Sequence, residues 1–257
     1  MVKIGVQIHP QTASMADLRA GWTGVDELGV DSLWTWDHFF PPLYGRPDDP
    51  HFEGWQVLAA MAVTTSRVSQ IGMLVSGGGY RNPDLLADMA RTLDHLSDGR
   101  AVLGVGSGWM DRDELEYGYP VRTPVQRLDE LAEALPRIRR RIGLLNPKPL
   151  GRLPILIGGN GEKRTLRLVA RYADMWNGYG DAGTIRRLNA VIDHWCDVEG
   201  RNPRDIERTV WIEAPAGDTV EALIEAGAEH IILGVRAPYD LRAVERLVEI
   251  RAELAHT

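Results

Sequence analysis

The sequence predicts an α/β fold, and within that class a single (β/α)8 barrel formed by residues 1–257. Short apolar runs rich in β-branched residues alternate with longer amphipathic segments, which is the pattern of a parallel sheet with helical crossovers. The short runs are continuously apolar, as in strands that are buried on both faces. Eight such units in 257 residues match the usual size of the barrel. A doubly wound open sheet is the alternative.

The elements follow one another in strand–helix order along the chain. The apolar runs predict strands at residues 2–9, 32–38, 68–75, 101–106, 155–158, 175–178, 209–213 and 230–234. The amphipathic segments predict helices at residues 14–28, 53–65, 82–96, 123–142, 162–172, 184–199, 219–226 and 241–255. Asn82 and Pro83 mark the third helix start, because asparagine caps helices and proline suits their first turn. A proline-rich loop over 39–52 and an acidic loop after the fourth strand complete the order.

Composition excludes two classes of partner. The net charge is −7 and the pI is about 5.5. Apart from Arg137–Arg141 on an expected helix, basic residues form no block, and a nucleic-acid backbone needs a concentrated basic face. No apolar segment approaches the roughly 20 residues of a membrane helix. We therefore expect neither a nucleic-acid nor a membrane partner.

The cysteine content and the N-terminus suggest a cytoplasmic protein. Cys196 is the single cysteine, so no intrachain disulfide can form, and its helical context predicts a core residue rather than a nucleophile. A lone cysteine fits a reducing compartment. The chain enters a strand pattern at once, without the charged and apolar segments of a secretory leader.

Polar, aromatic and glycine residues gather at the carboxyl ends of the expected strands, where barrels carry their chemistry. Glycines there let a large planar ligand approach the backbone, and Trp36, Trp109 and Trp176 offer apolar walls. The alternative is that the tryptophans fill the barrel mouth and the glycines relieve crowding.

The most informative segment is the glycine turn that ends the fifth strand, Pro154–Gly161. Its glycines expose backbone amides at the start of a helix, where the helix dipole adds partial positive charge. Lys163 and Arg164 add two full charges. The turn is a candidate phosphate site, and a tight turn without a ligand is the alternative.

Asp37 and His38 form the best acid/base candidate, because histidine titrates near neutrality and a neighbouring carboxylate can tune it. Consecutive strand residues point to opposite sides, so both face the cavity only if the strand has ended. His9 is a second candidate. No metal site is expected, since the chain has no cysteine pair and no histidines one helical turn apart. Gly104–Trp109 lacks the spacing of a nucleophile elbow.

Five ordered motifs resemble the luciferase-like monooxygenase superfamily, and most closely its actinobacterial branch that uses the deazaflavin coenzyme F420. The motifs are Asp31–His38, Tyr80–Pro83, Thr92–Arg100, Leu103–Trp109 and Ile157–Leu166. The resemblance runs in order from the first strand to Asn177, and weakly beyond.

The resemblance implies a TIM-like barrel with the deazaflavin at its carboxyl-terminal mouth. It places Asp37 and His38 beside the cofactor ring, as catalytic residues. It implies a bulge with a non-prolyl cis peptide on the third strand, near Gly72, Met73 and Leu74, of which Met73 and Leu74 would contact the cofactor. Cofactor contacts are further implied for Gly106, Ser107, Gly108, Trp109, Gly158, Gly159, Asn160 and Gly161.

Two departures from the family are visible. Its usual insertions after the fourth helix and the seventh strand are nearly absent, so a more open pocket is expected. Trp109 stands where the sugar-phosphate dehydrogenases of the group carry an acid, which argues against sugar-phosphate oxidation.

These considerations predict an F420-dependent oxidoreductase that transfers hydride between the deazaflavin and a small organic substrate, with His38 exchanging a proton. One alternative is an FMN-dependent monooxygenase, because a deazaflavin does not readily activate oxygen. Another is a cofactor-binding protein without chemistry. Members of the family are often dimers, so the resemblance suggests a homodimer.

Overall fold

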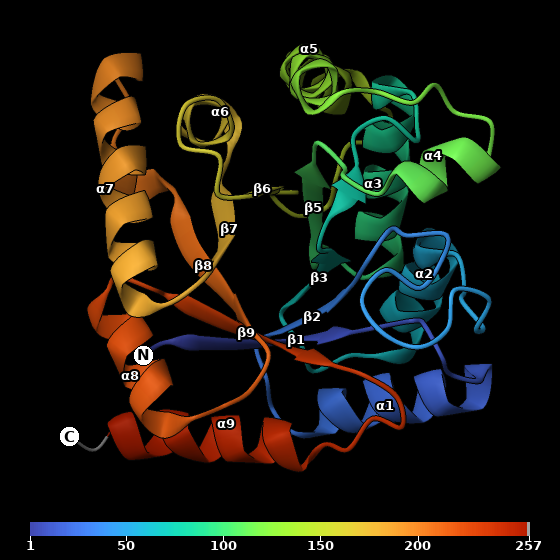
Figure 1. Cartoon of the computed structure of the whole chain (residues 1–257), viewed down its shortest axis with the longest axis vertical. Coiled ribbons are helices and arrows are strands. Elements are labelled where there is room, and N and C mark those ends of the chain that lie inside the picture. The colour runs from blue at the N-terminus through green and yellow to red at the C-terminus, as the bar shows by residue number, and fades with distance from the viewer. Residues whose placement is uncertain (256–257) are drawn as a thin grey trace.

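The structure, a computed structural model, describes residues 1–255 and shows a closed parallel barrel (Figure 1). Its strands are β1 Lys3–Ile8, β2 Ser32–Thr35, β3 Gln70–Met73, β4 Ser76–Gly77, β5 Ala101–Gly106, β6 Ile155–Gly158, β7 Met175–Tyr179, β8 Glu207–Ile212 and β9 His230–Val235. Their order is β3-β2-β1-β9-β8-β7-β6-β5-β4, and β3 also pairs with β5, which closes the sheet. The predicted (β/α)8 barrel is confirmed, and the open sheet is excluded.

Helices connect the strands and surround the barrel (Figure 1). They are α1 Met15–Glu27, α2 Gly54–Thr64, α3 Pro83–Leu96, α4 Asp111–Glu116, α5 Pro124–Leu144, α6 Thr165–Tyr172, α7 Ala182–Glu199, α8 Gly217–Glu225 and α9 Arg242–Leu254, with a short 3₁₀ helix at Pro203–Asp205. The Asn82 side chain accepts a hydrogen bond from the Asp84 amide, and Pro83 opens α3, so the predicted cap is confirmed. Within residues 1–255, no helix is both long and apolar enough to cross a membrane.

The third strand of the barrel is split into β3 and β4. Both halves pair with β5, through Ile71 opposite Ala101 and Ser76 opposite Val105. Between them the Leu74–Val75 peptide bond is cis. This interruption lies next to the position that the family resemblance implied.

Three differences from the predicted elements affect the residues near the barrel mouth. Strand β2 ends at Thr35 rather than at residue 38, so Trp36, Asp37 and His38 belong to the segment that follows it. Helix α6 begins at Thr165, and residues 162–164 form a turn. The acidic segment expected to be a loop contains α4. Each difference lies at the carboxyl-terminal end of the barrel.

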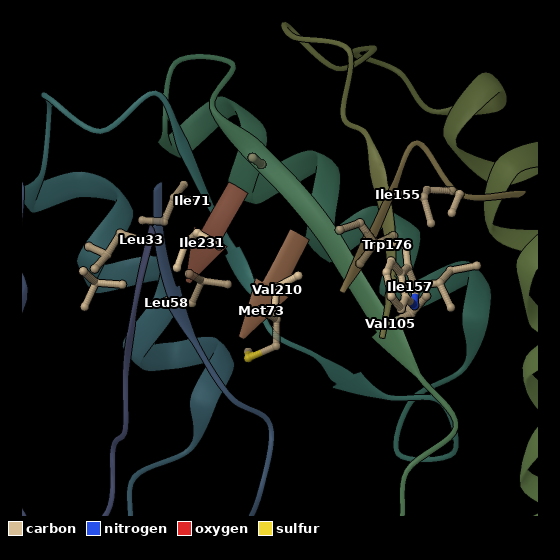
Figure 2. Packing of buried hydrophobic residues seen from close by; sticks show 14 of the residues in the cluster. Leu33, Leu58, Ile71, Met73, Val105, Ile155, Ile157, Trp176, Val210 and Ile231 are labelled. Carbon is tan, nitrogen blue, oxygen red and sulfur yellow. The ribbon is translucent and has the colours of Figure 1, made fainter. Parts of the chain in front are cut away.

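Two layers of buried apolar side chains hold the barrel together. Trp34, Leu74, Val102, Leu156, Met175 and Ile232 fill its interior. A larger cluster lies between the strands and the helices, and Figure 2 shows part of it, including Leu33, Leu58, Ile71 and Met73. Cys196 is fully buried in this outer cluster, as predicted. Alternation along each strand assigns neighbouring residues to different layers.

Candidate functional site

A cavity of about 590 Å³ opens at the carboxyl-terminal end of the barrel. The ends of β1, β4, β5, β6, β7 and β8 line it, together with the segment after β2. A larger cavity, of about 970 Å³, lies at the opposite end. Many of its lining residues are charged, and two of them, Lys3 and Glu207, form an ion pair at 2.8 Å. We assign the site to the carboxyl-terminal cavity, because barrels of this kind carry their chemistry at that end.

The floor of the cavity consists of the split third strand and the glycines opposite it. A Cβ atom at Gly106 would lie 2.7 Å from Val75, and one at Gly158 would lie 3.1 Å from it. The Gln7 amide donates to the Leu74 carbonyl oxygen at 2.6 Å and accepts from the Trp211 indole at 2.9 Å. The glycines therefore make room for Val75, and a polar network fixes the backbone of the interruption.

His38 borders this cavity and is held by a carboxylate from α4. Its Nδ1 atom lies 2.7 Å from Oδ2 of Asp113, a fully buried residue. The same carboxylate accepts hydrogen bonds from the Tyr80 hydroxyl and the Phe39 amide, both at 3.1 Å. The indole of Trp109 meets the imidazole edge-on, with ring centroids 5.3 Å apart. Asp113 thus holds the imidazole at Nδ1, and His38 is one of the residues that line the cavity.

Asp37 also lines the cavity but pairs with Arg81 rather than with His38. Its Oδ2 atom lies 2.6 Å from the Arg81 guanidinium and 3.2 Å from the Gly77 amide. Burial raises the pKa of Asp37 to about 6, although the charge of Arg81 opposes this change. Among the described residues, no partner is found for its buried Oδ1 atom. Asp37 therefore links the segment after β2 to β4.

His9, the second acid/base candidate, lies behind the cavity wall. Its ring stacks on Trp36, with centroids 4.0 Å apart, and the Tyr44 hydroxyl lies 3.3 Å from its Nδ1 atom. Burial, with a smaller contribution from the charge of Arg236, lowers the pKa of His9 to about 3. The imidazole is therefore neutral at neutral pH and supports Trp36.

The glycine loop after β5 and the glycine turn after β6 both reach the cavity. Gly106, Ser107, Gly108 and Trp109 line it, as do Gly158 and Gly159. Gly108 has a φ of +78° with open space around it, and the Trp109 side chain is 57% exposed. Gly159 has a φ of +126°. These conformations explain the glycines, because residues with side chains rarely adopt them.

The turn before α6 has exposed backbone groups but only one of the two expected free charges. No side chain caps α6, so the first amides of the helix have no side-chain acceptor. Arg164 is paired with Asp129, whereas Lys163 is exposed. The Asn160 side chain bonds to the backbone of Tyr179 at 2.7 and 3.3 Å. Asn160 thus braces the turn, and both Asn160 and Gly161 lie beyond the residues that line the cavity.

Two residues expected at the cavity lie elsewhere. Met73 is fully buried in the outer cluster, where its Cε atom would be 3.2 Å from a Cβ atom at Gly54, while Leu74 lines the cavity. Trp176 is also fully buried there and donates to the Gly159 carbonyl at 2.9 Å. The expectation that Trp176 forms a wall is wrong, because it points away from the interior that Asn177 faces. Trp211 lines the cavity instead of Trp176.

Sequence reasoning missed Asp113, Gln7 and Trp211. Asp113 lies in an acidic segment without apolar periodicity, and nothing local distinguishes it from Asp111. Gln7 and Trp211 carry a detectable signal, because both occupy inward positions near the carboxyl ends of expected strands. Within residues 1–255, no group of three or more histidine, cysteine or acidic residues has the arrangement of a metal site.

Proteins that are similar to this chain in sequence include two mycobacterial ketoreductases. A phthiodiolone/phenolphthiodiolone dimycocerosates ketoreductase of Mycobacterium kansasii is 29% identical over 264 residues, covering 84% of this chain and 71% of the relative. The ketoreductase of the same name from Mycobacterium bovis (strain BCG / Pasteur 1173P2) is 27% identical over 272 residues, covering 89% and 69%.

Solved structures that share the fold include an F420-dependent enzyme and an FMN-containing enzyme. An F420-dependent secondary alcohol dehydrogenase in complex with an F420-acetone adduct superposes with a TM-score of 0.83 at 18% identity, covering 97% of this chain and 98% of that one. The oxygenating constituent of 3,6-diketocamphane monooxygenase of Pseudomonas putida, in complex with FMN, gives 0.75 at 15% identity, covering 97% of both chains. The family model for luciferase-like monooxygenases matches residues 1–256, and the chain therefore belongs to the luciferase-like monooxygenase family.

Proposed function

We propose that this protein is an oxidoreductase that transfers hydride between coenzyme F420 and a small carbonyl compound or the corresponding alcohol. The observation that carries the proposal is the position of His38, whose imidazole borders the same cavity as the glycine loop and the glycine turn. The names of the curated relatives support the substrate class, since they are ketoreductases. The F420-dependent alcohol dehydrogenase of the same fold supports the cofactor.

The residues at the cavity fit a flat ring with an anionic tail. The Val75 side chain and the glycines opposite it give an apolar floor, and the exposed Trp109 indole gives an apolar wall. At the other side, Gly158 and Gly159 lead to the uncapped start of α6 with Lys163 beside it. Backbone amides at a helix start are suited to a phosphate. Gly158–Gly161 would hold the tail, and Gly106–Trp109 would flank the chain between tail and ring.

In such a reaction the residues of the protein would transfer one proton and exclude water. Oxidising an alcohol to a carbonyl removes a hydride from carbon and a proton from oxygen, and bound F420 would supply the hydride acceptor. His38 would take the proton from the hydroxyl oxygen, and would return it in the reverse direction. The apolar walls would shield the reacting carbons from water.

A direct test is titration of the purified protein with F420 and FMN in parallel, followed by turnover with secondary alcohols and ketones. The proposal expects quenching of F420 fluorescence, weaker binding of FMN, and oxidation or reduction of F420 without oxygen uptake. Tighter FMN binding with oxygen consumption in the presence of a flavin reductase would establish the monooxygenase instead. The His38→Ala variant separates an enzyme, which loses turnover but keeps the cofactor, from a binding protein, in which nothing changes.

A further inference from the structure

The carboxylate of Asp113 is arranged as a pure acceptor for three donors. It is fully buried at the first turn of α4. Oδ2 accepts from His38 and from the Tyr80 hydroxyl, and Oδ1 accepts from the Phe39 amide. An ionised carboxylate can only accept hydrogen bonds, so the nitrogen of His38 that faces it has to carry the proton.

This contact determines which nitrogen of His38 is free. In a neutral imidazole one nitrogen is a donor and the other an acceptor. With Nδ1 protonated against Asp113 at 2.7 Å, Nε2 is the unprotonated atom. The residue thereby presents a base to a hydroxyl in the cavity, and its protonated form presents an acid to a carbonyl.

Helix α4 is fixed to the segment that carries His38, so the contact is prepared before any ligand arrives. Arg112 lies over the Phe40 ring at 3.9 Å and donates to the Pro47 carbonyl at 2.6 Å. The next residue after Asp113, Glu114, is buried and bonds to Arg127 at 3.0 Å. A group held by its surroundings loses little entropy when it acts.

The sequence neighbour of His38 cannot serve this purpose. The Oδ2 atom of Asp37 is engaged by Arg81 and the Gly77 amide, and no hydrogen bond between Asp37 and His38 is found in the described part of the chain. The carboxylate that orients the imidazole therefore comes from 75 residues further along the chain.

We propose that Asp113 is the positioning residue of the acid/base group, which holds His38 in the Nδ1-protonated tautomer so that Nε2 exchanges the proton with the substrate. This inference adds a residue to the proposed function. It rests on that function only in taking a substrate as the group that exchanges a proton with Nε2. The tautomer itself does not depend on F420 or on any turnover.

The first test is nuclear magnetic resonance of ¹⁵N-labelled protein without cofactor. The signals of His38 are identified by their loss in His38→Gln. We expect the neutral ring of the wild type to be protonated at Nδ1, and Asp113→Asn to shift it toward the Nε2-protonated form that is favoured in water. A wild-type ring protonated at Nε2 would overturn the inference, whatever the cofactor proves to be.

The second test uses turnover and a matched control. Asp113→Asn is expected to lower kcat by roughly 10²-fold, the lower end of the contribution of a positioned acid/base group, with little change in F420 affinity. Asp218→Asn makes the same chemical change in the first turn of a distant helix, α8, at an exposed side chain that lines neither cavity, and is expected to leave kcat unchanged.

A third comparison separates positioning from a general structural role. In a His38→Gln background, adding Asp113→Asn should cost no further turnover, because residues that act as a unit are not additive. A full second loss would show that Asp113 acts independently of His38. If Asp113→Asn fails to fold, the wild-type tautomer still decides the question. Failure of the proposed function is recognised separately, as absence of F420 turnover in a protein whose tautomer is as expected.

Discussion

Ser32 Oγ lies 2.8 Å from His230 Nε2 inside the barrel, at the end opposite to the candidate site. The His230 Nδ1 atom lies 2.9 Å from Glu207, and the Trp34 indole donates to Ser32 Oγ at 2.6 Å. A serine, a histidine and an acid in this order resemble a nucleophile with its base. Ser32 and His230 are both fully buried and line neither cavity, so the arrangement satisfies buried polar groups instead.

Ser32→Ala should therefore destabilise the protein without changing cofactor binding. The substitution leaves the Trp34 indole and His230 Nε2 without their partner, and each unsatisfied buried group costs about 1–3 kcal/mol. Because two groups lose their partner, urea unfolding should report a loss of about 2–6 kcal/mol. Ser69→Ala removes an exposed hydroxyl that donates to the Asp31 carbonyl, and should cost much less. Equal losses in the two variants would contradict the interpretation.

The pKa of Asp37 predicts a decrease in stability as the pH rises. Burial raises this pKa to about 6 in the folded protein, above its usual value of 3.8. Between about pH 4 and pH 6 the folded state therefore holds more protons than the unfolded state, and the free energy of unfolding falls as the pH rises. Asp37→Asn should remove this part of the slope, although losing the partner of Arg81 lowers its overall stability. The measurement is urea unfolding of the wild type and of Asp37→Asn at several pH values between about 4 and 6. If the free energy of unfolding changes with pH equally in both, the prediction is wrong.

Gly159 should be sensitive to a methyl group for a conformational reason. Its φ of +126° is strained for any residue with a side chain, although the nearest atom to an added Cβ, on Thr165, is 3.4 Å away. Gly159→Ala should cost about 1–3 kcal/mol of stability, and should weaken F420 binding because the turn shifts. Gly143→Ala is the control, since Gly143 lies in α5 with no atom near an added Cβ. In a helix that change is neutral or stabilising by up to about 1 kcal/mol.

The sequence could predict the barrel because each unit is marked locally. Continuous apolar runs and helical periodicity identify the strands and helices, and the cap at Asn82 is visible from two residues. The site depends on contacts that local patterns do not contain. Asp113 contacts His38 because the acidic segment forms helix α4 and packs beside the segment that follows β2. This long-range contact has no local sequence signal. The error at Trp176 has another cause, since an aromatic residue at a strand end faces inward or outward according to the register.

Trp109 provides a test of the cavity wall that does not disturb the fold. Its side chain is 57% exposed and meets His38 only at an edge, so Trp109→Ala should hardly change the unfolding temperature. If a bound ring or substrate covers the exposed part of the indole, roughly 100 Å² of apolar surface is buried on binding. At about 25 cal/mol per Å² this is worth roughly 2.5 kcal/mol, or about 60-fold in affinity.

Binding of F420 and the KM of the substrate, measured separately, would show which of the two ligands covers the indole. Leu150→Ala is the matched control, because Leu150 is similarly exposed, at 61%, and lines neither cavity. A Trp109→Ala variant that keeps both constants at the wild-type values would mean that the ligands lie against another wall. Because Trp109 also touches His38, a fall in kcat alone would indicate that the indole supports the imidazole rather than a ligand.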